Sequence, residues 1–345
     1  MVNLDHPLIS PRDSDRKKGF AILLAWPETF CKQAGGWYDP LLNWLGISKG
    51  HYYRVGHAAV VLVNGFNGSL QYFDFGRYHS PYGYGRVRSE ATDPELKMNQ
   101  KAQLDARKII NFNAILMELY NRKACHGEGN LFAAVLSIDF EKAYKRAIFL
   151  QQNSPTKYGP FLWKGSNCSR FVNDVVRAGR PSFWPRWQLM FPLTLSPTPL
   201  GNVKAAGKWW IIPGISPDIP SWQTDLSTVL PAPQKHPLIP PQSYWLSGEG
   251  AGSWFHISRM SHLFLVRRFS PEGDLEFAGV FEATGNNSFY PQTPYMVEYL
   301  SHFEKITIIQ AGKVIVLKPI LRKYSLKAEM DGIRILLENL QLISN

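Results

Sequence analysis

The hydrophobic positions in the first half of the chain fall into short runs that predict a mixed α/β domain. Predominantly apolar runs at residues 19–26 and 131–138 predict two strands, the first of them buried. Residues 52–63 and 70–78 are rich in β-branched and aromatic side chains and flank the turn-forming sequence NGFNG, so they predict a β-hairpin. A further strand is expected over residues 85–91.

Helical spacing of apolar residues predicts three helices in the same region. The first covers residues 97–123 and the second covers residues 140–152. The third is expected to begin near Cys168 and to end at Gly179, because glycine commonly closes a helix. These elements predict an α+β domain over residues 19–180, in which an antiparallel sheet packs on helices.

The composition changes after residue 180. Thirteen of the 25 prolines lie within residues 181–242, which predicts an irregular connecting segment. Tryptophans are interleaved with these prolines, so the segment is expected to pack on a domain surface. Beyond it, alternating hydrophobic and polar residues predict a small β-rich domain over residues 243–345 that ends in an amphipathic helix over 325–343. Its five predicted strands are residues 254–259, 263–269, 275–284, 305–310 and 313–317.

Composition and charge narrow the class of protein. The 345 residues are 45% hydrophobic and 13% aromatic, which excludes a wholly disordered or fibrous chain. The 38 basic and 27 acidic side chains give a net charge of +11. These charges are dispersed and accompany no nucleic-acid-reading motif, so nucleic acid is disfavoured as a partner. A peripheral anionic membrane stays open as a partner, and the sequence predicts no oligomeric state.

Targeting signals and cysteine spacing complete this picture. Residues 1–18 form an N-terminal extension without the apolar core of a signal peptide, and no run of eighteen apolar residues follows. A cytoplasmic protein is therefore expected. Cys31, Cys125 and Cys168 are widely spaced and form neither a disulfide framework nor a CxxC metal knuckle. Free thiols are expected, and neither a metal nor a cofactor is predicted.

The clearest candidate site combines a cysteine with a histidine and an aspartate. Cys168 begins a predicted helix, where unpaired N–H groups and the helix dipole favour a thiolate. His57 lies in the first hairpin strand, and its imidazole can act as general base and acid for a thiol nucleophile. Asp74 lies in the second hairpin strand and can hold the ring in the useful tautomer. The alternative is that Cys168 and His57 are ordinary core residues.

The hairpin register offers a test of the third residue. In an antiparallel pair, the numbers of opposed residues have a constant sum. A turn centred between Gly65 and Phe66 places His57 opposite Asp74, whereas a centre two residues later places Asp74 four residues away. A loop with an odd number of residues turns Asp74 to the opposite face. The orienting role of Asp74 therefore depends on the turn.

Weaker candidates surround this site. Tyr52 and Tyr53, just before His57, can donate hydrogen bonds to an oxyanion, and Asn167 precedes the cysteine; the alternative is that the tyrosines are ordinary strand aromatics. Three arginines can bind a carboxylate or phosphate in a bidentate manner, or else form a solvated strand face: Arg77, Arg86 and Arg88.

Two short motifs resemble the circularly permuted papain-like cysteine hydrolases. The sequence GHA at residues 56–58 lies on a predicted strand, and NCSRFV at residues 167–172 opens a helix. This order resembles NlpC-type amidases and the lecithin retinol acyltransferase relatives. The resemblance covers about residues 19–180. It implies a papain-like core whose cysteine helix packs on an antiparallel sheet and whose thiol, assigned to Cys168, cleaves or transfers an acyl group. An aspartate, Asp74, stands where several members use histidine.

Three functions are compatible with these residues and motifs. The first is a cysteine amidase or peptidase that cleaves a peptide-like bond with Cys168, His57 and Asp74. The second is an acyltransferase that acts on a lipid or thioester with the same thiol, its basic surface facing a membrane. The third is a papain-like binding module without activity. In the first, the β-rich domain positions the substrate or a partner; in the third, the β-rich domain and the Pro/Trp-rich segment bind a peptide, glycan or other protein.

Overall fold

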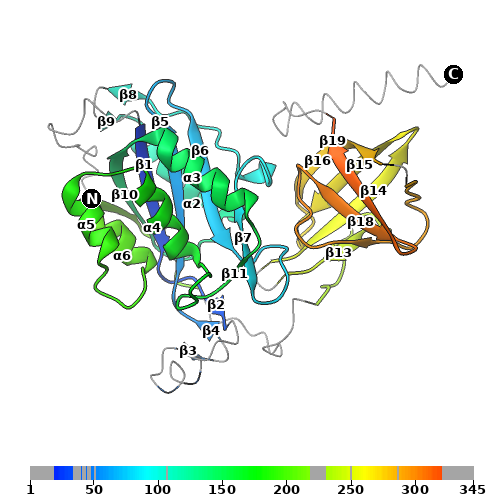
Figure 1. Cartoon of the computed structure of the whole chain (residues 1–345), viewed down its shortest axis with the longest axis horizontal. Helices are drawn as coiled ribbons and strands as arrows, with labels where there is room; N and C mark the ends of the chain where they lie inside the picture. The colour runs from blue at the N-terminus through cyan, green and yellow to red at the C-terminus, as the bar shows by residue number, and fades with distance from the viewer. Residues whose placement is uncertain are drawn as a thin grey trace. The chain divides into compact units, whose positions relative to one another are not determined.

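The computed structural model describes residues 19–33, 40, 44, 48–49, 52–105, 108–217, 231–248, 251–285 and 287–320. The chain divides into two compact units (Figure 1). Within the described limits, the first unit contains residues 19–77, 83–90 and 96–217, and the second contains residues 78–82, 91–95 and 231–320. Each unit is built on its own antiparallel sheet and hydrophobic core.

A seven-stranded antiparallel sheet forms the centre of the first unit. Its strand order is β11-β7-β6-β5-β1-β10-β12. The central strand β1 is buried along its whole length, as its unbroken apolar sequence predicts for a strand covered on both faces. The strands are β1 (Gly19–Trp26), β5 (His57–Asn64), β6 (Leu70–Gly76), β7 (Tyr84–Arg88), β10 (Leu131–Ile138), β11 (Thr156–Lys157) and β12 (Trp209–Ile212).

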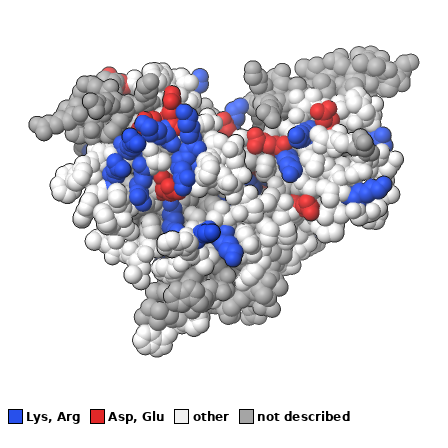
Figure 2. All heavy atoms as spheres, viewed as in Figure 1, with Lys and Arg blue, Asp and Glu red and all other residues white. Residues whose placement is uncertain are grey.

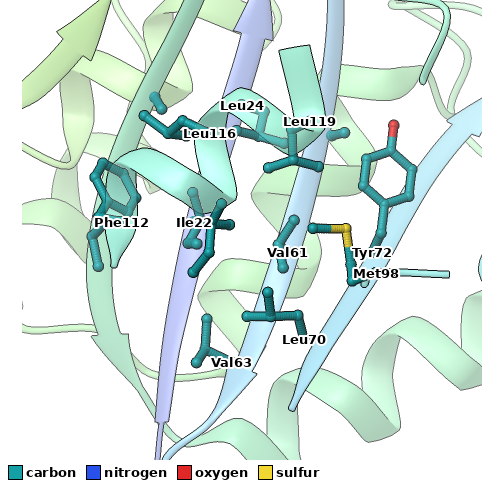
Figure 3. Close-up of a cluster of buried hydrophobic side chains, with 14 of the residues drawn as sticks. Ile22, Leu24, Val61, Val63, Leu70, Tyr72, Met98, Phe112, Leu116 and Leu119 are labelled. Atoms are coloured by element: carbon teal, nitrogen blue, oxygen red, sulfur yellow. The ribbon is translucent and has the colours of Figure 1, made fainter. Parts of the chain in front are cut away.

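Helices cover both faces of this sheet, because successive strand residues point to opposite sides. Ile22 and Leu24 face a first core, which packs against α2 (Figure 3). Ala21 and Leu23 face a second core, which packs against α3, α4 and α6. The helices are α2 (Phe112–Asn121), α3 (Phe140–Gln152), α4 (Cys168–Ala178), α5 (Phe183–Met190) and α6 (Pro199–Ala205). The predicted helices over 140–152 and from Cys168 to Gly179 are confirmed.

The predicted hairpin is present, but its first strand is shorter than expected. Tyr52 and Tyr53 form a separate strand, β4, which pairs with β2 (Cys31–Lys32) and β3 (Ser48–Lys49). The extended strand is interrupted at Gly56, which has φ +78°. A Cβ atom at this position would lie 2.7 Å from the Pro27 Cα atom. Only glycine fits this turn without strain, so β5 begins at His57.

The long helix predicted over residues 97–123 is wrong in its first half. Residues 104–105 and 108–109 form a small β-ladder, β8 (Leu104–Asp105) with β9 (Lys108–Ile109), and only α2 is helical. The Ala102 N–H donates to the Gly68 carbonyl, which ties this segment to the hairpin turn. Tertiary contacts of buried Met98 and Ala102 with the first core therefore override the local helical spacing.

The proline-rich segment contributes regular structure to the first unit. It contains α5 and α6, and β12 adds an edge strand beside β10. Trp210 is buried in the first core, where its ring meets Phe112 edge-on at 5.1 Å. Trp184 and Trp187, by contrast, stay exposed. The expectation of an irregular segment is therefore wrong for residues 183–190, 199–205 and 209–212.

A second seven-stranded antiparallel sheet forms the second unit, in the order β13-β14-β15-β16-β19-β18-β17. The five strands predicted here are confirmed, and both residues of the turn between β18 and β19, Ala311 and Gly312, have positive φ. The helix predicted over 325–343 lies outside the described residues. The strands are β13 (Tyr244–Leu246), β14 (Ser253–Met260), β15 (Leu263–Phe269), β16 (Leu275–Thr284), β17 (Met296–Val297), β18 (Ile306–Gln310) and β19 (Lys313–Pro319).

A buried charge cluster ties residues 91–95 to the second unit. Arg268, which is fully buried on β15, donates to the carboxylates of Asp93 and Glu95 and to Glu276 on β16. A buried arginine is stable only when its donors find acceptors, so this short segment is required to complete the unit.

Candidate thiol site

Cys168 is the first residue of α4, and the sequence before it explains why the helix starts there. The Asn167 side chain accepts a hydrogen bond from the Arg170 N–H at 2.8 Å, which is the usual arrangement of an N-cap. The N–H groups of Cys168 and Ser169 precede the first intrahelical hydrogen bond of an α-helix. The sulfur of Cys168 therefore lies where the helix terminus favours negative charge.

His57 is the first residue of β5, directly after the turn at Gly56. Its ring is buried and stacks on Trp26, its cross-strand neighbour, with ring centroids 5.9 Å apart. The Cys168 Sγ atom lies 4.0 Å from the carbonyl oxygen of Gly56, the residue before His57, and the Cys168 thiol helps to raise the pKa of His57. The structure thus brings together two residues that are 111 positions apart in the sequence.

The two residues come from opposite faces of the sheet. Ala59 and Val61 alternate with His57 along β5 and belong to the first core, whereas Cys168 belongs to the second core. They meet at the end of β5 rather than across its face, because each residue begins its own element. Cys168 itself is buried, with an exposed fraction of 5%.

Asp74 lies on β6 and is fully buried. The register pairs Ala59 with Asp74, so the turn is centred between Phe66 and Asn67, one residue from either of the expected centres. His57 then faces position 76, and Asp74 is its diagonal neighbour on the same face. The Asp74 Oδ2 atom lies 3.5 Å from the His57 Nε2 atom.

Arg88 on β7 is the main partner of Asp74. Its Nε atom donates to Oδ1 at 3.0 Å and its Nη2 atom donates to Oδ2 at 2.6 Å, a bidentate pair, and Nη2 also donates to the Ala124 carbonyl. The Tyr72 hydroxyl donates to Oδ2 at 3.1 Å. Asp74 is therefore held rigidly beside His57.

The charged forms of His57 and Asp74 stabilise each other. Burial opposes the charge on His57, but Asp74 and Cys168 outweigh it and raise the pKa of His57 to about 9. Burial likewise opposes the charge on Asp74, but Arg88 and His57 hold the pKa of that carboxyl well below its usual range. At neutral pH the imidazole is thus protonated, and it lies between a carboxylate and a thiol.

This arrangement predicts a pH dependence of stability. The pKa of His57 is raised from 6.5 to about 9, so the stabilisation is fully present below pH 6.5 and is lost as the pH rises through 9. We expect a loss on the order of 3 kcal/mol in the free energy of unfolding over this range. Urea denaturation at both ends of the range measures it. His57→Gln is the control, and an equal loss in that variant would contradict the assignment.

The weaker candidates lie apart from this group or have structural roles. Tyr52 and Tyr53 are buried on β4. Asn167 caps α4 through its side chain. The three arginines are buried, with exposed fractions of 6% for Arg77, 2% for Arg86 and 2% for Arg88, so they do not form a solvated strand face. Their binding roles toward a substrate stay predictions.

Sequence reasoning missed several residues around the thiol. Cys31 donates to the same Gly56 carbonyl as Cys168, with its sulfur 3.7 Å from the oxygen. Trp26 contacts His57, and Tyr72 contacts Asp74. The alternation of β6 could have revealed Tyr72, which lies two residues before Asp74 and so shares its face. Cys31 depends on the packing of β2 beside β4, which no local pattern encodes.

A pocket of about 550 Å³ lies beside α4 and is also lined by residues of α3 and α5. Its lining includes Lys164, Arg170, Arg177, Met190 and Leu195, but not Cys168. This pocket is therefore not evidence for the thiol chemistry. In the part of the chain that the structure describes, no three His, Cys, Asp or Glu side chains are grouped to hold a metal ion.

Two parts of the chain match known protein families. Residues 21–182 match the family described as type VI secretion system effector TseH-like, and residues 243–320 match the DUF6695 C-terminal domain. A crystal structure of the type VI secretion system effector TseH is similar at 21% identity and a TM-score of 0.35, covering 55% of this chain and 88% of that one. No curated protein matches the chain. None of the described helices is both long and apolar enough to cross a membrane.

Proposed function

We propose that the first unit is a thiol-dependent hydrolase that cleaves an amide bond of a peptide-like substrate. Cys168 is the nucleophile, His57 is the general base and acid, and Asp74 orients the imidazole. The observation that carries the proposal is geometric: the thiol at a helix N-terminus lies 4.0 Å from the carbonyl oxygen of the residue before His57, and the buried His57 ring lies 3.5 Å from a buried carboxylate. The order His, Asp, Cys is that of a permuted papain-like enzyme.

The chemistry proceeds in two steps. The Cys168 thiolate attacks the carbonyl carbon, and the N–H groups at the start of α4 stabilise the oxyanion. The C–N bond then breaks while the His57 imidazolium gives its proton to the leaving amine, which leaves a thioester. Water next attacks the thioester, and His57 takes a proton from that water. The carboxylic acid departs and the thiolate–imidazolium pair is restored.

The family match favours a role as a secreted effector for this activity. The matched family is described as a group of type VI secretion system effectors, and the match over residues 21–182 spans Cys168, His57 and Asp74. We therefore infer that the chain is a hydrolase-type effector. The second unit, which contains the match over residues 243–320, is assigned no part in the reaction itself.

Selective alkylation tests whether the thiol is activated. Iodoacetamide near neutral pH is expected to modify Cys168 before Cys31 and Cys125. Burial raises the pKa of Cys31, and it raises the pKa of Cys125 to about 12, whereas Cys168 is the first residue of α4. Mass spectrometry of timed samples measures the three rates.

Two controls accompany this measurement. In urea the three cysteines are expected to react at similar rates, which shows that the selectivity comes from the fold. His57→Gln is expected to slow the alkylation of Cys168 alone. Equally slow modification of all three cysteines in the folded protein would refute an activated thiol.

A further inference from the structure

An exposed apolar surface lies on α5 and the loop after it. We call it the α5 patch, and each of its members is at least 48% exposed: Phe183, Trp184, Trp187, Phe191, Leu193 and Leu195. Ring contacts make the patch continuous, with centroid distances of 5.4 Å from Phe183 to Trp184, 6.4 Å from Trp184 to Trp187 and 5.7 Å from Trp187 to Phe191. Exposed patches of this kind mark interaction sites.

The fold holds the patch outward. Leu189 on the inner side of α5 is buried in the second core, and its carbonyl accepts a hydrogen bond from the Asn173 side chain of α4 at 2.8 Å. The loop after α5 is tied back through the Ser196 hydroxyl, which donates to the Pro160 carbonyl at 3.2 Å. Since the inner side is fixed, the aromatic side cannot turn inward to become buried.

Basic residues lie on one side of this patch. Between Asp174 and Asp218 the sequence contains five Lys or Arg residues and no Asp or Glu. Arg177, Arg180 and Arg186 are all exposed. Figure 2 shows Lys and Arg side chains gathered over the part of the first unit where α3 and α4 lie, and α5 packs beside α4. The pocket along α4 adds Lys164 and shares Leu195 with the patch.

We propose that the α5 patch docks on a membrane surface that carries anionic lipid headgroups. Tryptophan, phenylalanine and leucine next to arginine and lysine are the combination that partitions into the boundary between headgroups and acyl chains. The apolar side chains insert at this boundary while the neighbouring cations attract the headgroup phosphates. A second copy of the chain is a poorer occupant, because two such surfaces would bring their positive charges face to face.

Vesicle sedimentation with the full chain tests this proposal. We expect binding to vesicles of phosphatidylcholine mixed with phosphatidylglycerol, weaker binding to phosphatidylcholine alone, and a decrease as sodium chloride screens the charges. The double variant W184S/W187S is expected to weaken binding to the mixed vesicles by about tenfold or more. Arg186→Glu is expected to weaken it and to reduce its salt dependence.

The controls separate this proposal from the others. Trp44→Ser removes a tryptophan that is 80% exposed but outside the patch, and it is expected to bind as the wild type does. Cys168→Ala is also expected to bind normally, so a failure of the hydrolase proposal does not affect this one. Absence of binding to the mixed vesicles, or equal binding by W184S/W187S, would overturn the proposal. So would a dimer in light scattering that W184S/W187S dissociates, since a second copy would then occupy the patch.

Discussion

Replacing Cys168 with alanine is expected to abolish amide cleavage, with a decrease in kcat/KM of about a thousandfold or more. The substitution removes the atom that forms the covalent intermediate, and the remaining residues can only bind and polarise the substrate. The side chain is small and lies at a helix terminus, so the fold is expected to survive. Release of new amino groups from peptide-like amide substrates, with wild type and variant in parallel, measures the effect.

Matched variants decide whether the loss comes from this thiol. Cys125→Ala removes a buried cysteine from the first core and is expected to leave the catalytic rate unchanged. His57→Gln is expected to lower the rate nearly as far as Cys168→Ala, and the double variant is expected to be no worse than either, because the two residues act as one unit. A Cys168→Ala protein that still cleaves the peptides would end the thiol mechanism.

The residues that the sequence could place were those whose signal is local. The helix start at Cys168 was predicted, and the structure shows that the Asn167 side chain caps it, a contact between neighbours in the chain. The hairpin around NGFNG was visible from its turn residues and its β-branched flanks. The turn contains an even number of residues, so His57 and Asp74 lie on the same face, as one of the expected registers required. The turn centre was not predicted correctly, because it lies midway between the two expected centres, one residue from each.

The features that the sequence could not place depend on contacts between distant segments. Arg86 and Arg88 lie two residues apart on β7. Both are buried, although an arginine in a strand more often faces solvent. Only the order of the sheet, which puts β7 beside β6, shows that Arg88 reaches Asp74. The helix prediction for the segment before α2 was wrong for the same reason, since packing of Met98 against the first core outweighed the helical spacing.

Replacing Arg88 with methionine is expected to destabilise the first unit by about 3–5 kcal/mol, because it leaves the Asp74 carboxylate buried without its main counter-charge. The double variant D74N/R88M is expected to recover part of this loss, since it removes the uncompensated charge. Arg146→Met breaks an ion pair with Asp174 whose side chains are 37% and 43% exposed, and its expected cost is below about 1 kcal/mol. Urea denaturation measures all three variants. Equal costs for Arg88→Met and Arg146→Met would mean that Asp74 does not depend on Arg88, and the rigid support inferred for His57 would be lost.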